Sequence, residues 1–384
     1  MFAPFSASAP LVGTIMDYCY KVGYGHAQTM LENYKQKNTA TKKPTVLVVG
    51  YGWGSSAFTD RLDRSKYDLQ IVSTTPYRFN QPRMIEALSP GFEYHNHATE
   101  FFDFPFQLAN PLYKEPISTI PLIQDTCISV NTNNKTVQGE KNTYPYDYLV
   151  ISTGSEPNDF GIPGVQENCL MFKTEADLYK LRETLDNQSS VIVLGAGPTG
   201  LELACKLRAL NKSVMVIEAS NTILPGFSKD FQDLTLQHLQ SKNIDLKLNS
   251  PVTSIQKTEI QTKTGSLPSN QPVIWTCGIK PVPFVRTLAF PKQHLSVYAQ
   301  LLVSPNVYAI GDSITGKGPP TAQNAKQQGY YLATLFNNDF QHTWYKYDEQ
   351  GRVLDIATGY IVETRGHVFH VPSWLSFFVN AVRE

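Results

Sequence analysis

Paired cysteines are missing from this sequence. Its 384 residues include 5 cysteines, and no two of them have C-x-x-C spacing. They are Cys19, Cys127, Cys169, Cys205 and Cys277. Zinc sites and disulfide frameworks need closely spaced or paired cysteines. The sequence therefore indicates neither, predicts no metal, and favours a reducing compartment inside the cell.

An excess of one charge sign and a long apolar run are also missing. Lys plus Arg and Asp plus Glu both number 33, so no overall field attracts nucleic acid or an anionic membrane. No apolar run approaches the roughly 18 to 20 residues that a membrane-spanning helix needs. Nucleic-acid binding and an integral helix are therefore not expected, whereas a short amphipathic anchor is still compatible.

The N-terminal extension, residues 1–44, lacks arginine. Its apolar residues Leu11, Ile15, Tyr18 and Val22 have helical spacing, which predicts a short amphipathic helix. The alternatives are a helix packed on the body of the protein and a loose tail. The missing arginines argue against a standard mitochondrial presequence, and no charged segment precedes an apolar stretch as in a secretory signal.

The most informative stretch is a strand, a glycine turn and a helix. The apolar strand Val191–Leu194 runs into a G-x-G-x-x-G pattern formed by Gly195, Gly197 and Gly200. The next strand ends in Glu218, about 20 residues beyond the glycines, where a dinucleotide fold has a ribose-binding acid. The three glycines would make the tight turn, admit a pyrophosphate and allow helix packing. A plain glycine-rich turn is the alternative, but it leaves Glu218 unexplained.

A similar pattern occurs earlier in the chain. The apolar strand TVLVVG runs into Gly50, Gly52 and Gly54, and Ser55 stands where a third glycine is usual. The following strand ends in Ser73 instead of an acid. This stretch predicts a first nucleotide site upstream of the second.

Further strands end in small residues. One ends at Thr153-Gly154, and another ends at Gly311-Asp312 just before a helix that begins near Thr321. A strand that enters such a turn permits a cofactor to approach the backbone closely, although the same pattern can be a simple strand end. The order of elements predicts an α/β protein with two Rossmann-like dinucleotide-binding domains.

These motifs resemble the pyridine nucleotide-disulfide oxidoreductase superfamily and, within it, the type II NADH dehydrogenases, which are non-proton-pumping NADH:quinone oxidoreductases. The resemblance is carried by VVGYGWGSSAF, YDLQIVS, YDYLVISTGSEPNDFGIPGV, GAGPTGLELA, VIWTCGIKP, NVYAIGDS and TAQNAKQQGYYLATLFN. The superfamily's cysteine pair after the first turn is absent, which excludes a lipoamide or glutathione reductase.

The resemblance implies an FAD domain that is split by an inserted NADH domain. The expected bounds are 45–186 and 290–340 for the FAD-binding domain, 187–289 for the NADH-binding domain, and 341–384 for a small C-terminal module. An apolar cluster from Trp374 to Val379 in that module is expected either to insert at a membrane interface or to pack in the core.

The resemblance also assigns residues to each ligand. The expected FAD contacts are Gly50, Gly52, Gly54, Ser73, Thr153, Gly154 and Asp312, and the expected NADH contacts are Gly195, Gly197, Gly200 and Glu218. Glu202 would lie near the nicotinamide, or would simply be an acid favoured by the helix dipole. Gln323 and Gln327 would line a quinone pocket beside the flavin, or would be a solvated pair of amides on one helix face.

The expected function is hydride transfer from NADH to FAD, followed by electron transfer to a quinone without proton pumping. The resemblance is compatible with a homodimer and with a peripheral position on a membrane such as the mitochondrial inner membrane. The sequence departs from the family in the charged segment Arg83–Glu86 and in its early end at Glu384. These departures keep two alternatives open: a soluble NADH oxidoreductase with another acceptor, and a non-catalytic nucleotide-binding protein.

Overall fold

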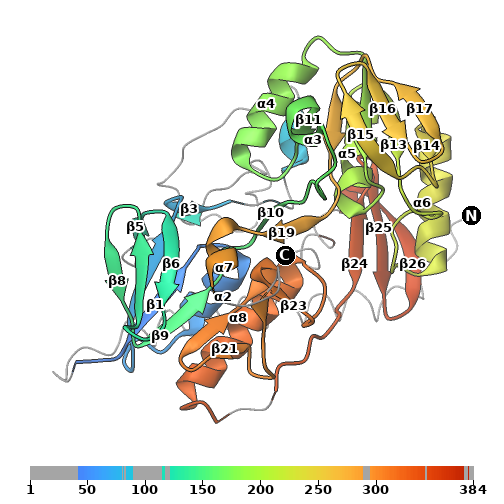
Figure 1. Cartoon of the computed structure of the whole chain (residues 1–384). Helices are drawn as coiled ribbons and strands as arrows, with labels where there is room; N and C mark the ends of the chain where they lie inside the picture. The colour runs from blue at the N-terminus through green and yellow to red at the C-terminus, as the bar shows by residue number, and fades with distance from the viewer. Residues whose placement is uncertain are drawn as a thin grey trace, which may run out of the picture.

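The computed structural model describes residues 42–79, 81, 84–89, 115–116, 122–288, 295–341, 344–375 and 379. These residues form two lobes, each built on a largely parallel sheet with helices beside it (Figure 1). The central strands are short apolar runs, as expected for parallel strands that are buried on both faces. The predicted α/β class with two Rossmann-like sheets is confirmed.

The first sheet has the strand order β21-β22-β9-β1-β2-β5. The bounds are β1 (Thr45–Val49), β2 (Asp68–Ser73), β5 (Leu122–Gln124), β9 (Tyr148–Ile151), β21 (Leu302–Ser304) and β22 (Val307–Ala309). Strands β1, β2, β5, β9 and β22 are parallel, and the edge strand β21 is antiparallel to β22. The carboxyl ends of β1, β9 and β22 therefore lie at one edge, where open α/β sheets bind ligands.

Two helices of this lobe, α2 (Trp53–Arg61) and α8 (Ala322–Asn337), pack tightly against each other. A Cβ atom on Gly329 would lie 2.1 Å from the Gly54 carbonyl oxygen, so the helices cross at a contact that only glycine fits. This contact brings the start of α2, which follows the first glycine turn, beside the glutamine-bearing helix α8.

The second sheet has the strand order β11-β18-β12-β13-β14, and all its pairs are parallel. The strand bounds are β11 (Cys169–Met171), β12 (Ser190–Leu194), β13 (Ser213–Ile217), β14 (Asp245–Lys247) and β18 (Val273–Trp275). The helices of this lobe are α3 (Val165–Asn168), α4 (Glu175–Leu185), α5 (Pro198–Ala209) and α6 (Lys229–Ser241). Strand β12, the second glycine turn and α5 form the strand, turn and helix that the sequence predicts from Val191 onward.

Smaller elements complete the two lobes. They are β3 (Tyr77–Arg78) with β4 (Glu115–Pro116); β6 (Cys127–Asn131), β7 (Thr136–Gly139) and β8 (Thr143–Pro145); β15 (Val252–Gln256), β16 (Glu259–Thr262) and β17 (Gly265–Pro268); β20 (Leu295–Ser296) with β23 (Ile314–Thr315); α7 (Pro283–Thr287); and the short 3-10 turns η2 (Glu86–Leu88) and η3 (Gly311–Ser313).

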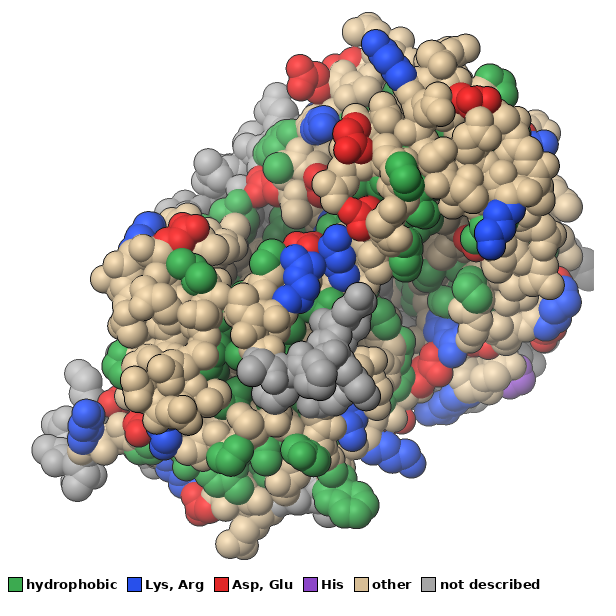
Figure 2. Space-filling model, viewed as in Figure 1, with side chains coloured by type: hydrophobic (Ala, Val, Ile, Leu, Met, Phe, Trp, Pro, Cys, Tyr) green, Lys and Arg blue, Asp and Glu red, His purple; other side chains and the backbone are tan. Residues whose placement is uncertain are grey.

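The lobes are joined by an antiparallel pair, β10 (Ser155–Pro157) with β19 (Ile279–Pro281). Ion pairs flank it: Lys280 lies 3.3 Å from Asp159, and Arg286 lies 3.0 Å from Glu156. The space-filling view shows a hollow between the lobes with charged side chains along it (Figure 2). The two sheets are thus connected by this pair and lie on either side of the hollow.

The C-terminal sheet, β24 (Arg352–Asp355), β25 (Gly359–Thr364) and β26 (His367–Pro372), packs against the second lobe. Side chains from β24, β25 and the turn between them, among them Leu354 and Ile361, are buried in the same core as helices α5 and α6. The short turn η4 (Ser373–Leu375) follows β26.

The expected domain bounds stay a prediction. Near these bounds, two short segments pack with the other lobe. Strand β11 lies within the range 45–186 expected for the first domain, yet it is hydrogen-bonded to β18 of the second sheet. Phe284 and Val285 lie within the range 187–289, yet they are buried in the core of the first sheet. Short segments on both sides of the β10/β19 joint therefore pack with the neighbouring lobe.

Several predicted segments lie wholly or partly outside the described residues. Residues 1–41 of the expected N-terminal helix are outside, as is Arg83; Met84 and Ile85 are buried against the second lobe. In the tail, Trp374 is 78% exposed, whereas Val379 is buried against the C-terminal sheet. No helix in the described part of the chain is long and apolar enough to cross a membrane.

Candidate functional site

The first glycine turn contains one packed glycine, Gly50, and one glycine that borders open space, Gly52. Gly50 has φ +91°, and a Cβ atom there would lie 2.4 Å from the Ser152 carbonyl oxygen, so this position makes the tight turn between β1 and α2. Gly52 has extended backbone, and a Cβ atom there would meet nothing within 4 Å. The turn therefore has one glycine required by packing and one that exposes backbone at a helix N-terminus.

Ser55, which stands where a third glycine is usual, has a structural role. Its side chain is buried, and its hydroxyl accepts a hydrogen bond of 2.8 Å from the Gly52 N–H. The serine thus caps the start of α2 from inside the turn.

The neighbouring strand ends carry the other expected FAD residues. Ser73 is buried at the end of β2. Gly154 has φ +69° and faces open space, and the buried Thr153 hydroxyl has no hydrogen-bond partner among the described residues. A polar atom without a partner beside an open backbone surface fits a site that a bound group completes.

Positive charge lies beside the first turn. The guanidinium of the buried Arg78 stacks 3.8 Å from the Trp53 ring centroid, and the Lys326 ammonium lies 4.6 Å from the same centroid. Trp53 itself begins α2 directly after Gly52. Two cations and a helix N-terminus favour an anionic group such as a diphosphate here. These residues fit FAD.

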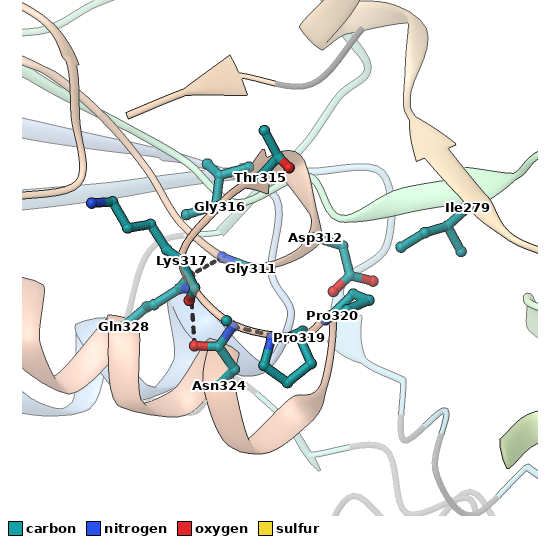
Figure 3. A pocket seen from close by; sticks show the side chains of 12 residues that line it. Ile279, Gly311, Asp312, Thr315, Gly316, Lys317, Pro319, Pro320, Asn324 and Gln328 are labelled. Carbon is teal, nitrogen blue, oxygen red and sulfur yellow. Dashed lines mark hydrogen bonds between the residues drawn. The ribbon is translucent and has the colours of Figure 1, made fainter. Parts of the chain in front are cut away.

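Asp312 forms an ion pair with Lys173 between the two lobes. Its carboxylate accepts a hydrogen bond of 2.9 Å from the Ser155 hydroxyl and lies 3.4 Å from the Lys173 ammonium, which comes from the segment between β11 and α4. Both charged side chains are about four-fifths buried, at 20% and 19% exposed. Asp312 also lines a pocket of about 210 Å³ together with Ile279, Gly316 and Pro320 (Figure 3).

The second glycine turn also combines packed glycines with one glycine that borders open space. Gly195 has φ +104°, and a Cβ atom on Gly200 would lie 2.0 Å from the Gly195 carbonyl oxygen, so both positions require glycine for packing. Gly197 has extended backbone with nothing within 4 Å of a Cβ atom. The N-terminus of α5 is therefore open to a phosphate group.

Glu218 lies directly beside this turn. One carboxylate oxygen accepts from the Ala196 N–H at 2.7 Å, and the other accepts from the Ser220 N–H and hydroxyl at 2.8 and 3.0 Å. Since a carboxylate has about four acceptor positions, these bonds leave about one for a ribose hydroxyl. The carboxylate therefore holds the turn, and its role toward a nucleotide stays a prediction.

Glu202 and the two glutamines contact the C-terminal segment. Glu202 is buried on α5, and its carboxylate accepts a hydrogen bond of 3.0 Å from the Asp355 N–H. Gln323 accepts from the Tyr347 hydroxyl at 2.6 Å, and Gln327 exchanges two hydrogen bonds with the Asp348 backbone at 2.7 and 2.9 Å. Neither glutamine lines the 210 Å³ pocket, so their roles toward a quinone stay predictions.

Burial suppresses the ionisation of the described cysteine thiols, of which Cys169 and Cys205 are buried and Cys127 and Cys277 are partly buried. Cys277 follows β18 beside the second glycine turn, and burial raises the pKa of its thiol to about 12. Burial has the same effect on Cys127, Cys169 and Cys205. These thiols are therefore protonated at neutral pH and are poor nucleophiles.

Sequence reasoning missed the buried polar residues behind the pocket. Asn324 and Gln328 line it from α8 and are almost completely buried, at 4% and 1% exposed. The signal was present in TAQNAKQQ, where these two amides are four residues apart and therefore share a helix face.

Two mitochondrial ubiquinone oxidoreductases are among the known proteins of similar sequence. The chain is 30% identical over 352 residues to the external alternative NADH-ubiquinone oxidoreductase, mitochondrial, of Yarrowia lipolytica; the match covers 77% of this chain and 59% of that protein. It is 28% identical over 329 residues to the external alternative NAD(P)H-ubiquinone oxidoreductase B2, mitochondrial, of Arabidopsis thaliana, covering 72% and 55%. The chain thus spans little more than half the length of these relatives. They confirm the resemblance to type II NADH dehydrogenases.

Solved structures agree on the fold. NDH2 from Plasmodium falciparum, in complex with NADH, superposes with a TM-score of 0.76 at 21% identity, covering 89% of this chain and 94% of that one. The model of the FAD-dependent family described as "Pyridine nucleotide-disulphide oxidoreductase" matches residues 44–329, which include both glycine turns and Asp312. The chain therefore belongs to the pyridine nucleotide-disulphide oxidoreductase family.

Proposed function

We propose that this protein is an FAD-dependent NADH:quinone oxidoreductase that does not pump protons. The observation that carries the proposal is the pair of open glycine turns, at Gly52 and Gly197, each at the carboxyl edge of its own parallel sheet. Ligands of such sheets bind at these edges. The β10/β19 joint and the Lys173–Asp312 ion pair hold the two sheets in fixed relation.

The first turn would hold the FAD pyrophosphate. The exposed backbone at Gly52 and Gly154, together with the cations Arg78 and Lys326, would bind and orient it. Asp312 would accept hydrogen bonds from the ribityl or pyrophosphate part. When bound, FAD would accept a hydride from NADH and pass the electrons on to a quinone.

The second turn would hold NADH. Backbone N–H groups at the start of α5 would bind its pyrophosphate, and the remaining acceptor position of Glu218 would bind the adenosine ribose. Glu202 would lie near the nicotinamide and would orient it. These residues supply alignment, which converts a bimolecular transfer into one between fixed partners.

Location and assembly are also proposals. The similar proteins of Yarrowia and Arabidopsis are mitochondrial NADH- or NAD(P)H-ubiquinone oxidoreductases. We propose a peripheral position on the mitochondrial inner membrane, supported by the exposed Trp374 side chain near the end of the chain. A homodimer would be compatible with this peripheral position on the membrane.

One experiment tests the proposed function directly. The purified protein is expected to be yellow, to bleach when mixed anaerobically with NADH, and to regain its colour when a short-chain quinone is added in a second stopped-flow mix. Bleaching without reoxidation by quinone would favour the alternative of an NADH oxidoreductase with another acceptor. A colourless protein that binds nucleotides without turnover would favour the non-catalytic alternative.

Glu218 is expected to set the preference for NADH over NADPH. Its carboxylate would repel a 2′-phosphate, so the double variant Glu218→Ala/Ala219→Arg should reduce the ratio of kcat/KM values for NADH and NADPH by about tenfold or more. The KM for NADH should also rise, because the Ala196 N–H loses its acceptor. Equal use of both nucleotides by the unmodified protein would contradict the assignment.

Gln323 and Gln327 are expected to affect only the step that involves the acceptor. Loss of one neutral hydrogen bond costs on the order of 1 kcal/mol, so Gln323→Leu or Gln327→Leu should slow reoxidation by quinone several-fold while reduction by NADH hardly changes. Tyr347→Phe is the comparison variant: it removes the phenol that competes for Gln323 but keeps both amides, so it should not slow reoxidation by quinone. If the double glutamine variant is reoxidised at the normal rate, the acceptor binds elsewhere.

A further inference from the structure

Two buried amides on α8 form the inner wall of the pocket shown in Figure 3. The Gln328 side-chain oxygen accepts a hydrogen bond of 2.6 Å from the Gly311 N–H, and its NH2 group donates to the Lys317 carbonyl and to Asn324 Oδ1 at 3.2 and 3.1 Å. Asn324 Nδ2 donates to the Pro319 carbonyl at 2.7 Å. The two side chains therefore hold the Gly311-Asp312 turn and the 317–319 loop at once.

The orientation of both amides is fixed by their partners. Gly311 N–H can only donate, so it selects the oxygen of Gln328, and the Lys317 and Pro319 carbonyls can only accept, so they select the NH2 groups. Asn324 Oδ1 also accepts a hydrogen bond of 2.6 Å from the buried Tyr345 hydroxyl. Every partner is thus satisfied in one arrangement, which makes the network rigid.

The loop packs directly onto this network. Gly318 has φ +96°, and a Cβ atom there would lie 2.8 Å from Asn324 Nδ2, so a larger residue would collide with this amide. Tyr345 lies at the start of the segment that continues to Tyr347 and Asp348, the partners of Gln323 and Gln327. The network therefore links the Asp312 turn to the segment that contacts the expected acceptor glutamines.

We propose that Gln328 and Asn324 are positioning residues that hold the Gly311-Asp312 turn and the 317–319 loop at the separation that FAD binding requires. The proposal rests on the proposed function, because it takes FAD to be bound at Asp312. Neither side chain needs to touch the flavin. Their role is to fix the backbone that does.

The test measures FAD affinity and amide hydrogen exchange in the full-length protein. Gln328→Leu is expected to weaken FAD binding to the apoprotein by about tenfold or more, since it leaves the Gly311 N–H and the Lys317 carbonyl without partners. Exchange at Gly311 should accelerate by a similar factor. This second readout needs neither flavin nor turnover, so it separates failure of this proposal from failure of the proposed function.

Asn337→Leu is the matched control on the same helix. The Asn337 amide also holds a loop by two hydrogen bonds, from the Asp63 N–H and to the Arg61 carbonyl, both 2.8 Å long, but it lies at the other end of α8. FAD affinity and Gly311 exchange should be unchanged in this variant. Equal effects in both variants would show only general destabilisation and would overturn the proposal, as would unchanged values in Gln328→Leu.

A second variant keeps the test decisive if Gln328→Leu does not fold. In Gln328→Glu, a protonated carboxyl can still accept from Gly311 and donate to Asn324, whereas the carboxylate can only accept and faces the Lys317 and Asn324 oxygens. FAD affinity of this variant should therefore weaken about tenfold as pH rises through the pKa of that buried carboxyl, and recover as pH falls. A pH profile identical to that of the unmodified protein would overturn the proposal.

Discussion

Gly52→Val is expected to give a folded protein that purifies without FAD. The backbone at Gly52 is extended, with φ −120° and ψ −159°, so it does not require glycine, and a Cβ atom there meets nothing within 4 Å. The valine methyl groups would instead occupy the space through which the pyrophosphate reaches the N–H groups of α2. Loss of two charge-assisted hydrogen bonds, at about 1.5 to 3 kcal/mol each, weakens binding by more than about a hundredfold.

The measurement is flavin absorbance per chain together with circular dichroism. The contrast is Gly50→Val, in which Cβ would lie 2.4 Å from the Ser152 carbonyl oxygen at φ +91°, so that variant should lose its fold and not only its flavin. One bound FAD per chain in Gly52→Val would show that the pyrophosphate does not approach this turn.

The fold and both glycine turns could be predicted from the sequence because they depend on local patterns. An apolar strand, a glycine with a required turn geometry and an amphipathic helix lie within about 20 residues of one another in each Rossmann unit. The division between glycines that are packed, such as Gly200, and glycines that are open, such as Gly197, follows from the same motif.

The remaining features depend on contacts between distant segments. Gln328 meets Gly311 across 17 positions of sequence, and the Glu202 carboxylate meets the Asp355 N–H across 153 positions. Strand β11 joins the second sheet through a pairing with β18, more than a hundred residues later. Local periodicity contains no information on such pairs, because tertiary packing selects the partner.

The positions of Gln323 and Gln327 on one helix could be predicted from their spacing, but their hydrogen-bond partners could not. Gln323 and Gln327 do share a face of α8, as their spacing of four indicates. Their amides are nevertheless bonded to Tyr347 and Asp348 of the segment that follows the helix. A quinone that binds to either amide must therefore share it with this segment or displace it, which makes the strength of these contacts part of acceptor binding.

Gly197→Val is expected to give the complementary result, a yellow protein that NADH no longer reduces. The backbone at Gly197 has φ −77° and ψ 179°, and a Cβ atom again meets nothing within 4 Å, so the valine is tolerated by the fold. Its methyl groups would block the N-terminus of α5, where the NADH pyrophosphate would bind. The loss of two phosphate hydrogen bonds should raise the Kd for NADH by more than about a hundredfold.

Anaerobic stopped-flow reduction measures this effect, and dithionite provides the control. Dithionite should bleach the Gly197→Val flavin as readily as that of the unmodified protein, because the first lobe and its FAD are unchanged. Gly200→Ala is the structural contrast, since its Cβ would lie 2.0 Å from the Gly195 carbonyl oxygen and should disturb the fold of the second lobe itself. Normal reduction of Gly197→Val by NADH would place the nicotinamide nucleotide away from this turn, and the two open glycines could then no longer be assigned to two different cofactors.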